Sequence, residues 1–276
     1  MADAKTVVLT GDFDNFKSQH VRLLEEASKL GDVHVLLWSD EAVRALEGHP
    51  PKFPEEERYY LLQADRCVKD VRSVTGQADR DSLPRVSGIN PEIWVVDEES
   101  DNTRKRAYCK LHGIQYHTLK KEDLRGFPVL PFARRVERSS RKRVIVTGCF
   151  DWFHSGHVRF FEEVSGLGDL YVVVGHDANI KLLKGEGHPM FSQEERRYMV
   201  QSVRFVKQAL ISSGQGWMDA EPEVAVIRPD IFAVNEDGDV PEKRAFCKEH
   251  GIEYVVLKRI PKEGLPLRQS TRLRGF

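Results

Sequence analysis

Residues 144–177 read VIVTGCFDWFHSGHVRFFEEVSGLGDLYVVVGHD, and residues 7–40 read VVLTGDFDNFKSQHVRLLEEASKLGDVHVLLWSD. In each segment a β-branched run is followed by a glycine turn, by apolar residues at helical spacing, and by a second apolar run. This pattern predicts a strand, a helix and a second strand. Short apolar runs separated by helical patterns are typical of a doubly wound parallel sheet with helices on both faces.

The two segments belong to two copies of one domain, because the match continues along the chain. EGHPPKFPEEERYYLL corresponds to EGHPMFSQEERRYMV, and INPEIWVVDEESD corresponds to IRPDIFAVNEDGD. A long internal repeat decides the architecture before any single residue is assigned a role. We therefore expect an α/β protein with two tandem Rossmann-like, doubly wound parallel-sheet domains, residues 1–133 and 144–276. A basic linker, residues 134–143, is interpreted as a solvated tether between them.

The same rules predict the later elements of the second copy. They give a helix at 194–208, strands at 224–227 and 231–234, and a helix at 241–251 that ends at its glycine. Cys109 and Cys247 repeat within equivalent helices and are expected in the core.

The composition limits the class of protein. The chain has 276 residues, 40% of them hydrophobic, and a formal net charge of -1, which gives no general attraction to nucleic acid or to an anionic membrane. Its four cysteines stand far apart, which argues against a disulfide scaffold or a zinc knuckle. No apolar run reaches the roughly 18 residues of a membrane span, and the first residues lack the features of a signal peptide. We expect a cytoplasmic protein without nucleic-acid or membrane partners.

The two copies differ where the first helix begins. The second copy has His154-Ser155-Gly156-His157, where the first copy has Lys17-Ser18-Gln19-His20. The free N–H groups and positive dipole end of a helix N-terminus suit bound phosphate. Two imidazoles one turn apart can face one bound group, donate hydrogen bonds to it, or become protonated near neutral pH. Gly156 leaves the backbone open to a phosphate, whereas Gln19 would obstruct it.

The run TGCFDWFHSGH resembles the hallmark of the nucleotidylyltransferase superfamily, in particular the cytidylyltransferases and the adenylyltransferase domain that makes ADP-heptose. HDANIKLLKG is similar to the family's lysine-bearing loop, FSQEERRYMVQSVRFV to its Glu-Arg helix, and QSTRLR to its terminal Ser-Thr element. The resemblance covers the second half of the chain. It implies transfer of a nucleoside monophosphate from a triphosphate, accompanied by Mg²⁺, onto a phosphorylated small molecule, with release of pyrophosphate.

On this resemblance, His154 and His157 would hold the triphosphate and stabilise charge at its α-phosphate, while Lys181 and Lys184 would bring the reacting phosphates together. Ser270 and Thr271 would cap a final helix and bind the β- and γ-phosphates. The catalytic candidates are His154, His157, Lys184 and Thr271. The candidates for nucleotide or phosphate binding are Gly148, Cys149, Phe150, Gly156, Lys181, Arg196, Asn235, Ser270 and Arg272. Asp151 either anchors the turn or helps to hold Mg²⁺.

The first copy lacks these groups, because Lys17, Gln19 and Glu47 stand where His154, Gly156 and Lys184 would be required. We infer that it keeps the fold, has lost the transferase site, and acts as the internal partner of a pseudo-dimer, with further homo-oligomerisation left open.

The identity of the base and of the acceptor stays open. The sequence favours CTP as the triphosphate and an alcohol phosphate or sugar phosphate as the acceptor. ATP with a heptose-phosphate-like acceptor is one alternative, and a non-catalytic nucleotide-binding or scaffold protein is another. A nucleotide-dependent oxidoreductase is disfavoured, because no G-x-G-x-x-G follows either first strand.

Overall fold

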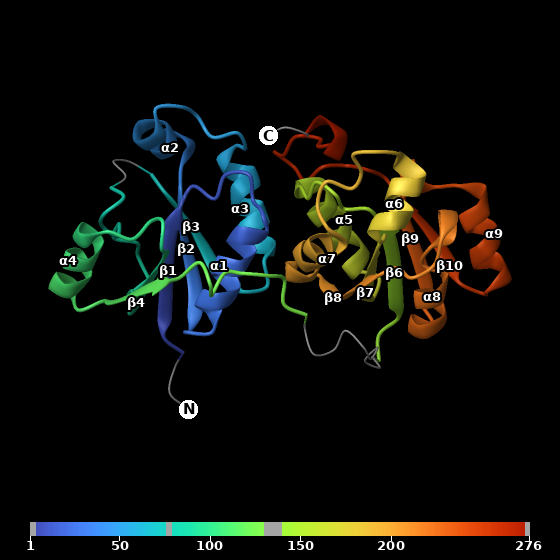
Figure 1. The fold of residues 1–276 in the computed structure, drawn as a ribbon, viewed down its shortest axis with the longest axis horizontal. Coiled ribbons are helices and arrows are strands. Elements are labelled where there is room, and N and C mark those ends of the chain that lie inside the picture. Colours follow the sequence, from blue (N-terminus) through green and yellow to red (C-terminus); the bar gives the residue numbers. More distant parts are fainter. Residues whose placement is uncertain (1–3, 76–78, 130–139, 274–276) are drawn as a thin grey trace. The chain divides into compact units, whose positions relative to one another are not determined.

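A computed structural model describes residues 4–75, 79–129 and 140–273 of the chain. They divide between two compact units, with the boundary between Gly126 and Phe127. Residues 130–139, which include most of the proposed linker, lie outside the described residues. Each unit is built on one five-stranded sheet (Figure 1).

The first domain has parallel strands in the order β3-β2-β1-β4-β5. Its strands are β1 Thr6–Gly11, β2 Asp32–Trp38, β3 Val68–Val74, β4 Ile93–Asp97 and β5 Gln115–Leu119. Its helices are α1 Ser18–Ser28, α2 Asp40–Glu47, α3 Glu55–Ala64 and α4 Thr103–His112. Helices α1 and α3 cover one face of the sheet, and α4 covers the other (Figure 1).

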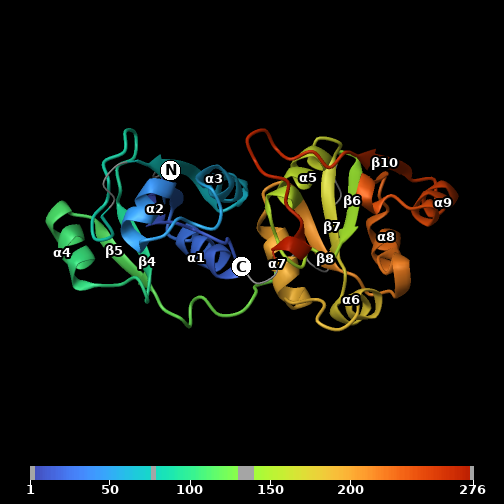
Figure 2. The ribbon, with the colours of Figure 1, turned by 90° about the horizontal axis from the view of Figure 1, so that it is seen from above.

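The second domain repeats this topology in the order β10-β9-β6-β7-β8, again with parallel strands. Its strands are β6 Arg143–Gly148, β7 Asp169–Val174, β8 Val206–Ile211, β9 Ile231–Asn235 and β10 Glu253–Leu257. Its α-helices are α5 Ser155–Ser165, α6 Asp177–Lys184, α7 Gln193–Ser202, α8 Glu221–Ile227 and α9 Pro241–Glu249, and its short 3₁₀ turns are η2 Gly216–Met218, η3 Glu236–Gly238 and η4 Ser270–Arg272. Helices α5 and α7 lie on one face of the sheet, and α8 and α9 lie on the other (Figure 2). The predicted fold class is confirmed.

The central strands are apolar on both faces because helices cover both faces. Val144, Ile145 and Val146 of β6 are each 0% exposed, which explains the continuous apolar run where a half-solvated strand would alternate. Cys109 and Cys247 are buried in the cores beneath α4 and α9, as expected. Burial raises the pKa of each of these thiols to about 11.

Two predicted elements of the second copy are wrong. The helix expected at 194–208 ends at Ser202, and its last three residues belong to β8. The strand expected at 224–227 is the end of helix α8, which has a proline in its first turn. Val224 and Ile227 of this helix are buried whereas Val226 is exposed, so the apolar run follows helical spacing.

Each sheet has a switch point at its central strand. In the first domain, β2 and β3 lie on one side of β1, and β4 and β5 lie on the other. In the second domain, β7 and β8 lie on one side of β6, and β9 and β10 lie on the other. The connections on the two sides of the central strand therefore lie on opposite faces of the sheet. Ligands of open α/β sheets bind outside the carboxyl ends of the strands at such a point. Among the helices of the described residues, none is long and apolar enough to cross a bilayer.

Candidate active site of the second domain

The turn between β6 and α5 has a residue in a strained backbone conformation, two positions after a glycine. Phe150 adopts the left-handed region, with φ of 51°, which is uncommon for an aromatic residue. A Cβ atom on Gly148 would lie 2.7 Å from Cζ of Phe150. The first domain repeats the conformation at Phe13, with φ of 48°. The turn is therefore a property of the duplicated fold, and it delivers the chain to the start of α5.

The two histidines stack on each other where α5 begins. Their ring centroids lie 3.9 Å apart with 19° between the planes. His154 is the N-cap residue, and its Nδ1 accepts a hydrogen bond of 3.1 Å from the backbone N–H of Gly156. This bond places the proton of the neutral ring on Nε2. A Cβ atom on Gly156 would lie 3.0 Å from Nδ1 and Cε1 of the same ring, so glycine gives the imidazole its space.

Two imidazole nitrogens of this pair are buried without a partner among the described residues: Nε2 of His154 and Nδ1 of His157. An unsatisfied buried polar group costs about 1–3 kcal/mol. Such groups in native proteins call for an explanation, and a bound ligand is one. The Nε2–H of His154 is therefore a donor available to a ligand.

Of the two roles expected for the rings, donating hydrogen bonds or becoming protonated near neutral pH, the surroundings of the pair favour the neutral, hydrogen-bonding form. Burial first, and then Arg259 and Arg268, lower the pKa of His154 from 6.5 to about 3. Burial, the neighbouring His154 and the cations Arg259 and Lys184 hold the pKa of His157 well below its usual value. The pair acts as neutral hydrogen-bonding groups unless a bound anion offsets these effects.

A cavity of about 360 Å³ opens in front of the turn. Its lining residues in the described part of the chain are Gly148, Cys149, Phe150, Asp151, Trp152, His157, Lys184, His188, Met190, Asp237, Arg259, Gln269 and Ser270. A smaller hollow of about 150 Å³ shares Phe150, His157, Asp237 and Arg259 with it, and adds His154, Gly156, Asn235 and Lys243 among others. Residues far apart in sequence thus meet at the carboxyl edge of the sheet, where the switch point lies.

Lys184 is the last residue of helix α6 and lines the 360 Å³ cavity. Lys181 does not line this cavity, and its ammonium group forms an ion pair with Glu186 at 3.0 Å. The segment expected as a lysine-bearing loop is thus helical. The backbone N–H of Gly185 bonds the carbonyl of Lys181 at 2.9 Å, which ends the helix directly after Lys184.

The terminal Ser-Thr segment forms the 3₁₀ turn η4 and no α-helix within the described residues. Ser270 lines the cavity and donates a hydrogen bond of 3.2 Å to the carbonyl of Trp152. Arg272 is exposed, and the side chain of Thr271 lies outside the described part of the structure. Cys149 lines the cavity as a thiol whose pKa is raised, chiefly by burial, which does not favour a nucleophile.

Arg196 was expected to bind phosphate, but its guanidinium is occupied by the protein. It is 1% exposed and donates to the carbonyls of Phe191 at 3.0 Å, Cys149 at 2.6 Å and Gly175 at 2.7 Å, and to the carboxylate of Asp177 at 2.7 Å. Arg58 of the first domain makes the same set of bonds, to the carbonyls of Phe53, Asp12 and Trp38 and to Asp40. A network present in both copies serves the shared fold, so we leave Arg196 out of the proposed site.

Asp151 has a structural role of the same kind. One of its oxygens accepts the backbone N–H groups of Met190 at 2.7 Å and Phe191 at 3.1 Å. Asp14 of the first domain ties the equivalent turn to residues 52 and 53 in the same way. In the described ranges, no group of three or more His, Cys, Asp or Glu side chains could hold a metal ion. The described side chains therefore form no magnesium site of their own, and the hydrogen bonds of Asp151 support the anchor role of the two expected for it.

Arg259 is a site residue that the sequence prediction missed. It follows β10 and lines both hollows of the site. Its guanidinium is held by Asp237 and by a hydrogen bond of 2.9 Å to the carbonyl of Arg268. The feature that could have pointed to it is its position just after the carboxyl end of a strand, because the histidines follow the carboxyl end of another strand at the same edge of the sheet.

Comparison with known proteins shows the family of the chain. Residues 8–138 and 145–272 each match the family described as cytidylyltransferase-like. An FAD synthase of Ferroglobus placidus is 33% identical over 135 residues, covering 48% of this chain and 85% of that protein. An FAD synthase of Aciduliprofundum boonei is 37% identical over 119 residues, covering 42% and 76%. The bifunctional protein HldE of Campylobacter concisus is 33% identical over 102 residues, covering 37% of this chain and 21% of that protein. With both of its halves matched, the chain belongs to the cytidylyltransferase-like family of nucleotidyltransferases.

Proposed function

We propose that the second domain transfers a nucleoside monophosphate from a nucleoside triphosphate to the phosphate of a small molecule and releases pyrophosphate. The observation that carries this proposal is the stacked pair His154 and His157, with buried nitrogens that lack partners among the described residues. The pair adjoins a cavity that also contains Lys184 and Arg259. Partnerless polar atoms beside cationic side chains fit a phosphate-bearing ligand.

In this reaction an oxygen of the acceptor phosphate attacks the α-phosphorus, and the bond from that phosphorus to the bridging oxygen of the β-phosphate breaks. The attacking phosphate is already ionised, so the step needs no base and no covalent enzyme intermediate. The Nε2–H of His154 donates to the α-phosphate, and Lys184 and Arg259 offset the charge of the two reacting phosphates. The turn and the helix N-terminus fix these groups in advance, so the protein contributes position and charge.

Other groups in this proposal act on the leaving pyrophosphate and on the base. Ser270 lies on the cavity wall and is the candidate donor to the pyrophosphate portion, with Thr271 next to it. Asn235 lines the smaller hollow and is the candidate contact for the nucleoside. Lys181 and Arg272 stay predictions from the sequence. Mg²⁺ would accompany the triphosphate substrate and would supply charge neutralisation for it.

Two triphosphates, CTP and ATP, are candidates for the nucleotide substrate. The sequence favours CTP. The relatives named FAD synthase favour ATP, because FAD contains an adenine nucleotide. The acceptor panel accordingly includes flavin mononucleotide together with alcohol phosphates and sugar phosphates.

The test is pyrophosphate release by the full chain with Mg²⁺, each of four nucleoside triphosphates and the acceptor panel. We expect His154→Ala and His157→Ala to lower kcat about 10²–10³-fold, as the loss of a preorganised donor does. His20→Ala is the matched control, because His20 stacks on Phe16 in the first domain as His157 stacks on Phe153. Full activity of the His157 variant, or no pyrophosphate with any pair of substrates, would overturn the proposal.

A further inference from the structure

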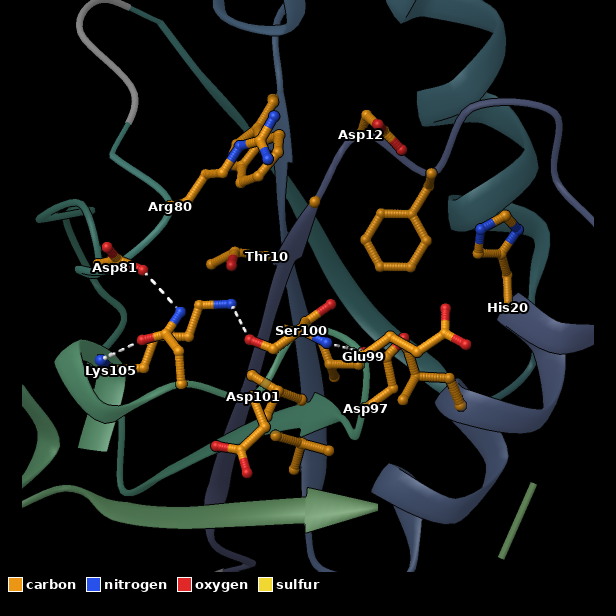
Figure 3. Close-up of a pocket in the computed structure, with 18 of the residues that line it drawn as sticks. Thr10, Asp12, His20, Arg80, Asp81, Asp97, Glu99, Ser100, Asp101 and Lys105 are labelled. Carbon is orange, nitrogen blue, oxygen red and sulfur yellow. Dashed lines mark hydrogen bonds between the residues drawn. The ribbon is translucent and has the colours of Figure 1, made fainter. Parts of the chain in front are cut away.

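The first domain has its own cavity, of about 540 Å³, at the carboxyl end of its sheet. Figure 3 shows residues of its lining, among them Thr10 of β1, Asp97 at the end of β4, and Asp12 and Asp81. The cavity therefore lies at the switch point between β1 and β4, the position at which an open α/β sheet binds ligands. Its volume lies in the usual range of small-molecule sites.

This cavity lacks the groups that would receive phosphate. Lys17 stands at the N-cap of α1 in place of His154, and the remaining histidine, His20, has its Nδ1 occupied by the backbone N–H of Lys17 at 3.1 Å. Glu47 lines the cavity at the position that Lys184 has in the second domain. A carboxylate there repels a phosphate.

The charge of the lining is inverted relative to the second domain. The carboxylates that line the first cavity are Asp12, Glu47, Asp81, Asp97, Glu99 and Asp101, against the cations Arg80 and Lys105. Arg80 pairs with Glu47, and Lys105 donates to the carbonyl of Ser100 at 2.6 Å. Three further lining carboxylates are ion-paired, Asp81 with Arg104, Glu99 with Lys121 and Asp101 with Arg106. In the described part of the chain, Asp12 and Asp97 are therefore the lining carboxylates that have no ion pair. The two hollows of the second domain have the carboxylates Asp151 and Asp237 against the cations Lys184, Lys243 and Arg259.

The difference is confined to the lining, because the surrounding loop is the same in both domains. Lys105 on α4 corresponds to Lys243 on α9, whose Nζ donates to the carbonyl of Gly238 at 3.2 Å. Asp101 pairs with Arg106 just as Asp239 pairs with Arg244. Asp101 and Asp239 thus belong to the shared loop, and the two cavities differ in charge at Asp12, Glu47 and Asp97, where the second domain has Cys149, Lys184 and Asn235.

The wall of the cavity combines these carboxylates with apolar side chains. In the described part of the chain, no three acidic, histidine or cysteine side chains lie close enough together to hold a metal ion. Leu9, Trp38 and Val96 form buried apolar parts of the wall. The complementary ligand is thus a cation of molecular size with a hydrocarbon or ring portion, rather than a metal ion.

We propose that the first domain binds a small organic amine, with its protonated nitrogen facing Asp97 and Asp12 and its apolar portion against Leu9, Trp38 and Val96. The binding does not depend on the reaction of the second domain. It gives the first copy a ligand of opposite charge to the triphosphate.

The test measures the affinity of the full chain for three probes of similar shape and different charge. Isothermal titration calorimetry is used, and no nucleotide is present. Tryptamine carries a positive charge, its alcohol analogue tryptophol is neutral, and indole-3-acetate is negative. We expect tryptamine to bind about tenfold more tightly than tryptophol, and indole-3-acetate to show no binding. Equal affinity for tryptamine and tryptophol, preference for the anion, or no binding of tryptamine would overturn the proposal.

The site is located with a charge-removing pair of substitutions, Asp12→Asn with Asp97→Asn. Each asparagine keeps an oxygen for the backbone N–H that the aspartate now accepts, from Asp14 and Ser100, and β9 of the second domain ends in asparagine at the position of Asp97. We expect this variant to bind tryptamine about tenfold more weakly with an unchanged circular dichroism spectrum.

The matched control is Glu41→Gln with Glu56→Gln, which removes two negative charges from exposed positions on α2 and α3. It is expected to bind tryptamine as the unmodified chain does. An equal loss of affinity in both double variants would show attraction to net charge alone and would overturn the assignment of the site.

Discussion

His154 should make the second domain sensitive to acid, and the variant His154→Asn should remove part of that sensitivity. Burial lowers the pKa of this histidine from 6.5 to about 3 in the folded protein. Below pH 6.5 the unfolded chain binds a proton at this position that the folded chain does not bind. Stability contributed by the neutral ring is therefore present above pH 6.5 and falls as the pH decreases toward 3.

The magnitude follows from the distance between the pH and the unfolded-state pKa. At pH 5, the folded state still has a neutral ring, and each pH unit below 6.5 corresponds to about 1.4 kcal/mol. The unmodified protein should lose about 2 kcal/mol of unfolding free energy through His154 between pH 7 and pH 5. Asparagine keeps a side-chain oxygen for the N-cap position, so His154→Asn should fold.

The assay is urea unfolding at pH 7 and pH 5, followed by circular dichroism, for the unmodified chain, His154→Asn and the control His250→Asn. His250 is exposed to solvent in the same domain. We expect the stability difference between the two pH values to shrink by about 2 kcal/mol in His154→Asn and to stay unchanged in the control. An identical pH dependence for all three proteins would refute the burial argument.

Four substitutions test which residues serve the reaction and which serve the fold. Gly156→Gln places a Cβ atom 3.0 Å from the ring of His154 and should lower kcat/KM for pyrophosphate release by about 10²-fold while the circular dichroism spectrum is retained; an unchanged kcat/KM would contradict the assigned ring position. Lys184→Glu introduces the residue that the first domain has, and should lower kcat/KM at least as much without changing the urea midpoint. Arg196→Ala leaves three carbonyls and a carboxylate without their partner, and should cost about 3–5 kcal/mol of unfolding free energy, as should Arg58→Ala in the first domain. A stable Arg196→Ala protein that has lost only activity would return this arginine to the site.

The architecture was predictable from the sequence because the internal repeat fixes it twice. The strand, turn and helix around Gly148 and His154 also follow from local pattern, since glycine, N-cap position and apolar spacing are all short-range signals. The residues 224–227 were misassigned because a short apolar run has no periodicity of its own that separates strand from buried helix.

The site was only partly predictable, for two physical reasons. Arg259 comes from a strand end distant in sequence, and its approach to the histidines depends on the order of the strands in the sheet. Arg196 lies in a segment that resembles a functional helix, and only the structure shows that backbone carbonyls consume its donors. The presence of an equivalent arginine, Arg58, in the copy without the histidine pair was a signal in the sequence that pointed to a structural role.

Hydrogen bonds from Arg58 and to Asp14 hold the first turn of the first domain. Arg196 and Asp151 make the equivalent bonds in the second domain, and this repetition has an evolutionary consequence. Arg58, Asp14 and Arg196 do not line the cavities, and Asp151 lines the second one with an oxygen held by the backbone, so most of each lining takes no part in these bonds. After a duplication, mutations at the rim can reverse the sign of the enclosed field while the backbone around it keeps its shape. A domain that no longer catalyses the reaction can in this way come to bind a different small molecule. Selection then acts on the residues that line its cavity and not on those that hold its backbone.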